Sequence, residues 1–492
     1  MRGTLKFIIP AAFTLILIFS CQKDEFITEP GAMLTFSTDT LYFDTILTTL
    51  GSTTQAFKIY NRHDQAIEIQ ELYIAGGNSS FFRLNVDGVK GNRHVNISIP
   101  RKDSIFVFAE ATIDPLDANN PLLIKDSIIF KTNNNLQDVK LIAYGQDVKI
   151  FNRKILKTQT WSPEKPYLII YGVSIAKDEV LTIQPGTRIF LHNFASLEVK
   201  GRLEAIGTFE EPIIFSGDRF DDRYESSAGQ WGAIGIDSIS RGSILEHVII
   251  KNSIVGIQVG YPNDNSRSQV ELRNCMITNC AAYGIYAFGA EILASNTIIA
   301  DCAQIAILCL MGGDYNFYHC TISNVSGFYP GYYQGGYKAR GTPSLFFRNY
   351  FDWYDYDNDY RIIEVQRTRN LNLNFYNSIL YGTLTQEIHY DSVASVQTNY
   401  KFDHCLIKNH PDSLKYDDPT RFNAILLNED PYFINDSIVN AAYDFRLTDS
   451  SKAINAGNLE LVKDVARLEF DFEGNSRIED GSPDLGAYEY QE

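Results

Sequence analysis

Two ionisable side chains stand in matching strand contexts and could act as a general acid and base. Glu364 lies in segment 362–365 and His389 in segment 387–390, and both segments alternate apolar and polar residues. Alternation turns successive side chains to opposite faces of a strand, so we expect Glu364 and His389 to point outward from adjacent coils of a repeat. A carboxylate and an imidazole that reach one substrate can transfer protons. A solvated sheet face also carries such residues by default, and that interpretation stays open.

Aromatic residues are concentrated in segment 328–360, which holds 13 of them in 33 residues, whereas they make up 13% of the whole chain. The apolar face of a pyranose suits an aromatic ring, so exposed rings beside a groove can bind sugars. The same composition suits a lid that packs its rings onto the fold, because so apolar a loop must bury part of itself. With the outward residue of a preceding strand included, the candidate ligand contacts are Tyr286, Tyr332, Tyr333, Tyr337, Trp353 and Tyr354.

Three carboxylates at alternate positions end this segment, at Asp355, Asp357 and Asp359. Carboxylate oxygens at such a spacing can present ligands to Ca²⁺. The segment fails as an EF-hand, because Tyr360 stands where the loop needs glycine and Gln366 where it needs a bidentate glutamate. We therefore expect either an irregular Ca²⁺ loop or ordinary solvated loop charge, and the sequence indicates no other cofactor.

A repeat can be aligned on a recurring apolar-x-apolar-x-(Asn/His) unit. Its spacings are 27, 22, 23, 30, 28 and 27 residues, each of which suits one coil of a solenoid. Stacked side chains of this kind can hydrogen-bond from coil to coil, so we interpret the column as a ladder at a turn. A metal site is disfavoured, because the first two histidines lie about 14 Å apart at the stacking rise of parallel strands. The column is His247, Asn274, Asn296, His319, Asn349, Asn377 and His404.

Six cysteines fall within the repeat region, and two of them, Cys280 and Cys302, lie on neighbouring coils. These two could pair as a disulfide, but stacked parallel side chains seldom present its geometry. Buried thiols that fill the coil interior are the favoured alternative.

The elements that position these residues are short strands without intervening helices. Parallel strands without helical crossovers are typical of a solenoid whose coils stack at about 4.8 Å. The opening coils contain Leu181-Thr-Ile-Gln-Pro-Gly-Thr187, Leu203-Glu-Ala-Ile-Gly-Thr208, Pro212-Ile-Ile-Phe215 and Trp231-Gly-Ala-Ile234. These motifs resemble the pectate-lyase-like superfamily, which implies a right-handed parallel β-helix. We place it at residues 149–450, with the aromatic insertion at 327–361.

Residues 34–148 alternate apolar and polar positions between Asn, Gly and Asp turns, which predicts seven or so strands in a β-sandwich. The relevant motifs are Phe57-Lys-Ile-Tyr-Asn61, Phe82, Ile113-Asp-Pro115 and Leu141-Ile-Ala-Tyr-Gly145. They resemble the immunoglobulin-like domains of the Hydin-type and choice-of-anchor families. The resemblance implies a spacer or docking module.

Residues 451–492 contain Ala453-Ile-Asn-Ala-Gly457, Asp471-Phe-Glu-Gly-Asn-Ser-Arg477 and Pro483-Asp-Leu-Gly-Ala-Tyr-Glu489. This run resembles the choice-of-anchor-type C-terminal segment of bacterial β-helix proteins. A solenoid must cover its last apolar face and open strand edge, so we expect a cap with structural carboxylates. The predicted fold class is all-β: an N-terminal immunoglobulin-like β-sandwich followed by a right-handed parallel β-helix solenoid with a C-terminal cap.

Residues 1–20 have the pattern of a secretory leader, with Arg2 and Lys6 before an apolar run of 13 residues. A membrane-spanning helix needs about 20 apolar residues, so a cleaved leader is favoured. Residues 18–21 resemble the lipobox of bacterial lipoproteins. That resemblance implies a lipidated Cys21, a linker over 21–33 and a lipid anchor in the outer membrane, and the charged residues 22–25 favour display at the cell surface.

The formal charge of −17 disfavours nucleic acid as a partner. The scaffold and its aromatic insertion favour a surface protein for glycan binding or adhesion, whose partner is a polysaccharide, a glycoprotein glycan or another surface protein. A polysaccharide lyase or glycoside hydrolase on the same face is the alternative, and a structural envelope protein is a second one. Against an enzyme, the chain lacks the Asn-Thr-Asp, Gly-His-Gly and Arg-Ile-Lys motifs of polygalacturonases and a clear aspartate triad with a basic residue, as in pectate lyases.

Overall fold

In the computed structural model of this chain, almost all of the regular secondary structure described is β-strand. The chain divides into two compact units, residues 1–147 and 148–492, and each unit has its own hydrophobic core. No helix in the described part of the chain is both long enough and apolar enough to cross a membrane. The described residues are 25–48, 50–114, 122–220, 224, 227–262, 266–325, 329–330, 337–338, 340–356, 362–436, 443–463, 465–479 and 481–491.

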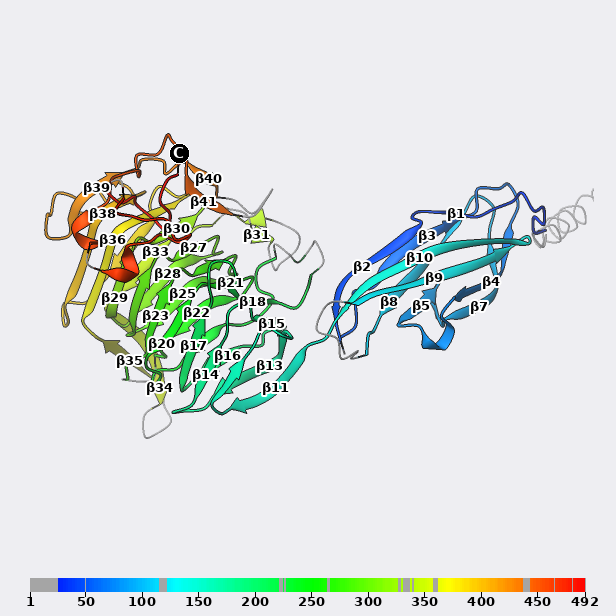
Figure 1. Ribbon diagram of the computed structural model, residues 1–492, viewed down its shortest axis with the longest axis horizontal. Coiled ribbons are helices and arrows are strands. Elements are labelled where there is room, and N and C mark those ends of the chain that lie inside the picture. The colour runs from blue at the N-terminus through cyan, green and yellow to red at the C-terminus, as the bar shows by residue number, and fades with distance from the viewer. Residues whose placement is uncertain are drawn as a thin grey trace, which may run out of the picture. The chain divides into compact units, whose positions relative to one another are not determined.

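The first unit is a β-sandwich of two five-stranded sheets (Figure 1). Its strands are β1 (Thr35–Phe36), β2 (Thr40–Leu47), β3 (Gln55–Tyr60), β4 (Ile67–Ile74), β5 (Phe82–Val86), β6 (Val89–Lys90), β7 (Arg93–Ile99), β8 (Ser104–Ala111), β9 (Leu122–Thr132) and β10 (Asn135–Gln146), with a 3₁₀ turn η1 (Gly77–Ser79). The sheet orders are β1-β3-β8-β5-β6 and β2-β10-β9-β4-β7, and all pairings are antiparallel except that of β2 with β10. The sequence predicted seven or so strands, fewer than these ten, because a two-residue strand such as β6 is too short to show alternation.

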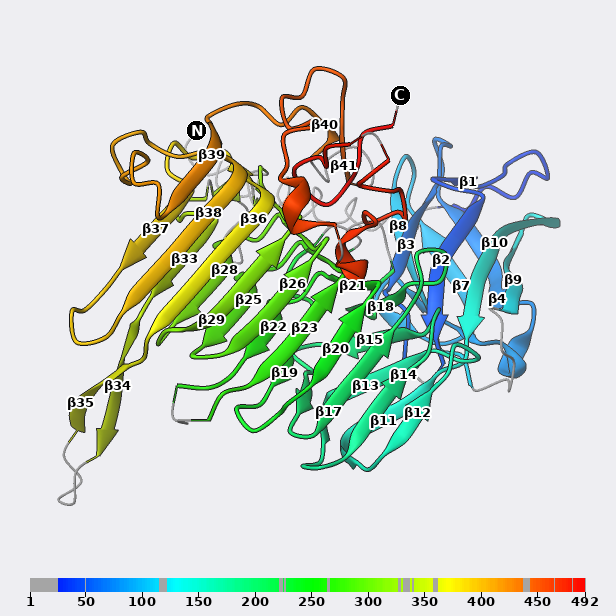
Figure 2. The same cartoon turned by 60° about the vertical axis from the view of Figure 1, so that its left-hand side comes forward.

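The second unit is a parallel β-helix, as predicted, whose strands stack into three faces (Figure 1, Figure 2). Stack 1 contains β16 (Leu197–Val199), β19 (Ile234–Ile236), β22 (Val255–Val259), β25 (Tyr283–Phe288), β28 (Ile305–Leu310), β33 (Leu345–Arg348) and β37 (Ile388–Asp391). Stack 2 contains β12 (Gln159–Trp161), β14 (Val180–Ile183), β17 (Arg202–Ile206), β20 (Ser243–Glu246), β23 (Gln269–Arg273), β26 (Glu291–Ser295) and β29 (Gly313–Tyr318). Stack 3 contains β15 (Arg188–His192), β18 (Ile213–Gly217), β21 (Val248–Lys251), β24 (Met276–Thr278), β27 (Ile298–Ala300) and β30 (Thr321–Asn324).

Longer strands bend from one stack into the next. Stacks 3 and 1 share β11 (Lys149–Leu156) and β13 (Tyr167–Ile175), while stacks 2 and 3 share β36 (Leu371–Gly382), β38 (Thr398–Ile407) and β39 (Phe422–Leu427). Outside the stacks lie the pairs β31 (Tyr329–Pro330) with β32 (Tyr337–Lys338), β34 (Tyr350–Tyr356) with β35 (Ile362–Thr368), and β40 (Phe433–Asn435) with β41 (Asp444–Leu447).

Columns of apolar side chains fill the interior of the β-helix. In the last coils of stack 2 the column consists of aromatic rings: Phe317 and Phe375 stack with centroids 4.5 Å apart, and Phe375 and Phe402 with centroids 5.5 Å apart. All three are fully buried. Tyr416, from the loop between β38 and β39, closes the C-terminal end of the interior with its ring 4.7 Å from that of Phe422.

A column of asparagine and histidine residues marks the turn between stacks 2 and 3. The Nδ2 amide of Asn274 lies 3.0 Å from Nε2 of His247, and Asn296 Nδ2 donates to Asn274 Oδ1 over 2.9 Å. On later coils, Asn377 Nδ2 lies 3.0 Å from His319 Nε2. These backbones have positive φ, which Asn and His tolerate better than branched residues do. The positive-φ members of the column are His247, Asn274, Asn296, His319, Asn377 and His404.

Asn349 does not belong to this column, which corrects the alignment made from the sequence. His319 and Asn377 are 58 residues apart in the sequence but contact each other. They therefore occupy neighbouring coils, and the chain between them forms one enlarged coil. Asn349 instead follows β33 in stack 1, where its Nδ2 donates to the carbonyl of Val393 over 2.9 Å. The apolar-x-apolar-x-Asn pattern that ends at Asn349 does not by itself identify a ladder position. Strands of all three stacks bury alternate residues, so all of them show this alternation.

The C-terminal segment, in its described residues 443–491, covers the β-helix along the side of several coils. Its apolar side chains pack on Ile298 of β27, on Ile379 of β36 and on Leu406 of β38. It contains β41 and the 3₁₀ turns η2 (Leu459–Leu461) and η3 (Ala466–Leu468). The segment therefore packs on the β-helix as a cover of the ladder, which corrects the prediction that it covers the last apolar face of the solenoid.

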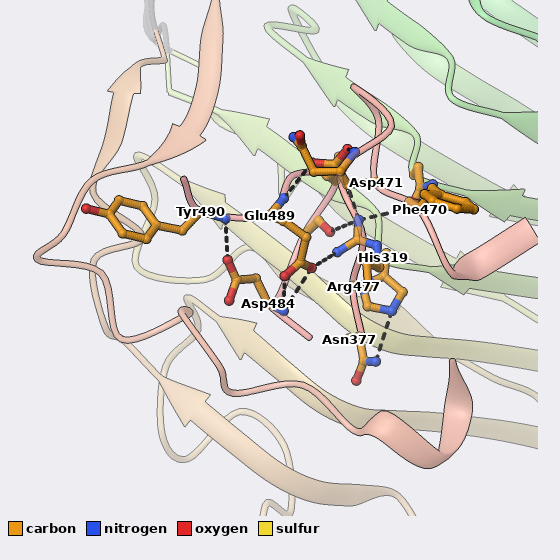
Figure 3. Close-up of polar contacts among 12 residues, drawn as sticks. His319, Asn377, Phe470, Asp471, Arg477, Asp484, Glu489 and Tyr490 are labelled. Atoms are coloured by element: carbon orange, nitrogen blue, oxygen red, sulfur yellow. Dashed lines mark hydrogen bonds and ion pairs between the residues drawn. The ribbon is translucent and has the colours of Figure 1, made fainter. Parts of the chain in front are cut away.

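A buried ion pair between Arg477 and Glu489 holds this segment on the ladder (Figure 3). The two side chains are 0% and 4% exposed. Arg477 Nη2 also donates to Asn296 Oδ1 over 3.1 Å, and the backbone N–H of Ala487 donates to Thr321 Oγ1 over 2.9 Å. Directional bonds thus join the segment to two successive coils.

Glu489 gives this contact a defined pH dependence. Burial raises the pKa of Glu489 to about 8, while Arg477 acts in the opposite direction. A carboxyl group whose pKa is higher in the folded state takes up a proton on folding, so its contribution to stability is lost as pH rises through the folded-state pKa. We expect the free energy of unfolding to fall between about pH 5 and about pH 8, and to fall less in Glu489→Gln. Urea denaturation of both proteins across this range measures the difference, and parallel profiles would contradict the assignment.

Candidate functional site

The outer face of stack 1 is the surface on which the sequence placed the candidate site. Strand pairing aligns one outward residue on each coil: Gln258, Tyr286, Leu308, Phe346 and His389. Their strand neighbours Ile285 and Leu345 are fully buried in the interior. The outward column therefore changes from a polar residue at Gln258, through an apolar middle, to His389.

The middle of this face is a buried apolar cluster. Leu308 and Leu310 of β28 are only 5% and 4% exposed, although they belong to the outer face. Tyr286 packs between Tyr283 and Phe288, with ring centroids at 4.8 Å and 4.5 Å. Burial raises the pKa of the Tyr286 hydroxyl to about 12. Tyr286 is thus a packing residue with part of its ring at the surface.

The hairpin β34–β35 continues the aromatic surface away from stack 1. It follows β33 directly, and it projects from the β-helix in both views (Figure 1, Figure 2). The ring of Phe351 meets that of Phe288 edge to face at 5.2 Å and lies 6.3 Å from that of Trp353. Trp353 is partly buried, and Tyr354 is 66% exposed. The ring contacts therefore run from the buried cluster to the partly buried Trp353, while alternation along β34 turns Tyr354 to the other face of the hairpin.

Glu364 and His389 do not stand on adjacent coils, which corrects the acid and base hypothesis. Glu364 lies on β35 opposite Tyr354, whereas His389 pairs with Phe346 of β33. The alternation around Glu364 resembles that of a strand in one of the three stacks. The strand that this coil contributes to stack 1 is β33, however, so the segment of Glu364 lies outside the stack. The required juxtaposition of the two groups is absent.

Polar side chains instead gather at the rim of this face formed by β33, β37 and the first residue of β34. His389 stacks on Phe346 with centroids 5.3 Å apart, and Tyr350 donates to Asp391 Oδ2 over 2.5 Å. Arg348 is the register partner of Asp391, and its guanidinium lies 4.8 Å from the centroid of the Tyr350 ring. We name Arg348, Tyr350, His389 and Asp391 the polar rim. Alternation along residues 345–348 could have revealed Arg348, had that strand been recognised.

The hydrogen bond between Tyr350 and Asp391 sets the protonation state of the polar rim. It raises the pKa of Tyr350 and lowers the pKa of Asp391, and the nearby Arg348 also favours the carboxylate. At neutral pH the phenol is protonated and the carboxylate is ionised. Neither of these two groups is poised to exchange a proton near neutral pH.

Several predicted site residues lie outside the described part of the chain. These are Cys21, Tyr332, Tyr333, Asp357 and Asp359, and only the backbone is described for Tyr337 and Asp355. Among the residues that the structure does describe, no group of three or more His, Cys, Asp or Glu is arranged to hold a metal ion. The Ca²⁺ loop and the lipidation of Cys21 stay predictions.

The cysteines of the repeat region are all buried and free of disulfides. The thiols of Cys280 and Cys302 are neighbours on adjoining coils: a hydrogen bond between them lowers the pKa of Cys280, and burial raises that of Cys302. Ser253 Oγ lies 3.3 Å from Cys280 Sγ. These thiols therefore serve as interior packing groups.

Comparisons with known proteins give no assignment. No family model matches the chain, and no curated protein matches it. Partial likenesses among solved structures include a protein of unknown function from Porphyromonas gingivalis W83 (8% identity, TM-score 0.18, 26% of this chain and 60% of that one) and PapD-like domain 7 of human CEP192 (6%, 0.18, 26% and 95%). A third is the catalytic unit of the GH87 alpha-1,3-glucanase from Streptomyces thermodiastaticus strain HF3-3 (9%, 0.16, 75% and 65%). This chain spans less than two thirds of the first and third, and likenesses this distant carry no conclusion about function.

Proposed function

We propose that this chain is a cell-surface glycan-binding protein that contacts its ligand through the outer face of stack 1 and the hairpin β34–β35. The observation that carries the proposal is the row of ring contacts from Phe288 through Phe351 to Trp353, on a hairpin whose other face carries the exposed Tyr354. Aromatic rings on a rigid scaffold suit the apolar faces of pyranose rings. The proposed ligand is a polysaccharide or the glycan of a glycoprotein.

The polar rim supplies the directional contacts that such a ligand needs. The guanidinium of Arg348 only donates, the ionised carboxylate of Asp391 only accepts, and the imidazole of His389 can do both. Sugar hydroxyls both donate and accept, so this mixture suits them. A lyase or hydrolase is the weaker proposal, because Glu364 and His389 do not stand on adjacent coils.

Display at the cell surface rests on the N-terminal sequence. The lipobox-like residues 18–21 support a lipid anchor on Cys21, and such an anchor would hold the chain at the outer membrane. A surface-protein partner or a purely structural envelope role becomes the better proposal if no glycan binds.

Trp353 offers a reporter that is specific to this site. The chain has three tryptophans, and the other two, Trp161 and Trp231, are 1% and 0% exposed. We expect polysaccharide binding by the soluble chain that begins after Cys21 to change tryptophan fluorescence and to reduce its quenching by iodide. An unchanged spectrum with every polysaccharide that binds would place the ligand elsewhere.

The double variant Trp353→Ala/Tyr354→Ala tests the same contact by affinity. Truncation of an aromatic hot-spot residue costs about 2 kcal/mol or more, and 1.4 kcal/mol is about tenfold in affinity, so we expect binding at least about tenfold weaker. Tyr432→Ala removes a 49% exposed tyrosine elsewhere on the second unit and should bind as the wild type does. Equal affinity of the double variant and the wild type would show that the glycan does not bind at the hairpin β34–β35. Release of unsaturated oligosaccharides would replace the binding proposal with a lyase.

A further inference from the structure

The first unit carries a separate exposed aromatic surface on the sheet β1-β3-β8-β5-β6. Along β8, Val107 faces the core, while Phe106 and Phe108 are 44% and 36% exposed. Their rings lie 5.8 Å apart with an interplanar angle of 20°, and the ammonium of Lys58 lies 4.6 Å above the Phe106 ring. Ala56 stands opposite Phe108 on β3, and its small side chain leaves that flank of Phe108 open.

A groove of about 840 Å³ lies beside Phe108. That volume falls within the range of about 300–1,000 Å³ that is usual for ligand sites. On β5, Asn85 stands opposite Phe108 and Arg83 opposite Glu110, and Lys90 of β6 stands opposite Asn85. All five side chains line the groove, so an aromatic platform adjoins a row of polar groups across three strands.

One polar atom in this groove lacks a partner. Asn85 Oδ1 is buried and accepts no hydrogen bond from any described residue. Buried acceptors are almost always paired, because burying one without a donor costs free energy. The orphaned oxygen therefore marks a position where a ligand donor completes the bonding.

The other groove residues define the kind of ligand. Arg83 and Lys90 offer donors, and Arg83 is held in place by bonds from Nη1 to the carbonyls of Ser80 and Phe82. The carboxylate of Glu110, which also lines the groove, offers an acceptor. An anionic ligand would meet the carboxylate of Glu110, whereas hydroxyl groups use donors and acceptors together.

We propose that this groove is a second binding site and that it takes a neutral chain of pyranose sugars. One sugar ring stacks on Phe108, and the hydroxyls of the adjoining units bind Asn85, Arg83 and Glu110. The site shares no residue with stack 1 or the hairpin, so it does not depend on the function proposed for them. If both sites bind one polysaccharide, their avidity exceeds either affinity.

Isothermal titration of the soluble chain with four neutral hexasaccharides tests the proposal. The probes are the β-1,4-glucose, β-1,3-glucose, β-1,4-mannose and β-1,4-xylose hexamers. We expect at least one to bind, and Phe108→Ala to weaken that binding by about tenfold or more. Tryptophan fluorescence should stay unchanged, and Trp353→Ala/Tyr354→Ala should bind equally well, which separates this site from the first.

Two further variants keep the test independent of folding. Tyr42→Ala removes a 68% exposed tyrosine from the opposite sheet of the same unit and should leave affinity unchanged. Glu110→Gln preserves shape and should weaken binding several-fold with an unaltered unfolding temperature. The proposal is overturned if no neutral hexamer binds, if Phe108→Ala binds as tightly as the wild type, or if hexagalacturonate binds more tightly than every neutral probe.

Discussion

The variant Glu387→Gln will unfold with a free energy about 3–5 kcal/mol below that of the wild type, because it leaves a buried guanidinium without its counter-charge. Glu387 and Arg340 are both fully buried. Arg340 Nη1 donates to Glu387 Oε2 over 2.9 Å, and Nη2 donates to Oε1 over 2.6 Å. Ser344 donates to the same carboxylate from its backbone N–H and its hydroxyl, and Leu384 donates from its backbone N–H.

The position of this ion pair explains why its loss lowers the free energy of unfolding so strongly. Arg340 Nη2 also donates to the carbonyl of Asn324, the last residue of β30, over 3.0 Å, and Nη1 donates to the carbonyl of Thr342. The guanidinium thus joins the two ends of the loop that leads from stack 3 into β33. The pair fixes where the enlarged coil re-enters stack 1, and it thereby supports the strand that carries the polar rim.

Urea denaturation followed by the fluorescence of Trp231, which is buried in the β-helix, measures this loss. Glu429→Gln is the matched control: its partner Lys452 is 63% exposed, and we expect a change of about 0–1 kcal/mol. Arg340→Met/Glu387→Met removes both charges and should recover much of the stability. If Glu387→Gln lowered the free energy of unfolding no more than Glu429→Gln does, the buried ion pair would not be what holds the enlarged coil in place.

The ladder and the coil that follows it show how far the sequence predicts this molecule. Positions such as His247 and Asn296 are recognisable because a positive φ restricts the residue type, and stacking repeats that restriction on every coil. The alignment fails at Asn349, and Glu364 is assigned to the wrong strand, because one coil carries two insertions with strand patterns of their own. A pattern of alternating residues identifies a strand but not the stack to which it belongs.

The polar rim and the groove of the first unit depend on contacts between strands that are distant in the sequence. Arg348 and Asp391 meet only because β33 pairs with β37. Phe108 and Asn85 meet only because β5 pairs with β8. Register decides these contacts, and a one-residue slip would turn every side chain to the other face. The β-helix and the sandwich could therefore be predicted, whereas the composition of their binding surfaces could not.

Arg477→Met is expected to release the C-terminal segment from the ladder, with a loss of about 3–5 kcal/mol in the free energy of unfolding, because several buried oxygen atoms lose a charged donor whose hydrogen bonds contribute about 1.5–3 kcal/mol each. Besides its ion pair with Glu489, Arg477 Nη2 donates to Asn296 Oδ1 and to the carbonyls of Gly486 and Ala487 over 3.0–3.1 Å. Methionine fills much of the volume but replaces none of these bonds. Without Arg477 the raised pKa of Glu489 would rise further, so this carboxyl group would stay protonated.

Hydrogen exchange separates release of the segment from general destabilisation. The backbone N–H groups of Gly486 and Ala487, which bond to the β-helix, should exchange faster in Arg477→Met, while those of the first unit should not change. Burial and the charge of Arg477 together hold the pKa of His319 well below its usual value, so that pKa should rise in the variant and can be followed by NMR. Arg446→Met is the control, because it breaks an exposed ion pair with Asp444 on the same segment and should leave both readouts as they are in the wild type. Unchanged exchange at Gly486 and Ala487 in Arg477→Met would show that apolar packing alone holds the segment in place.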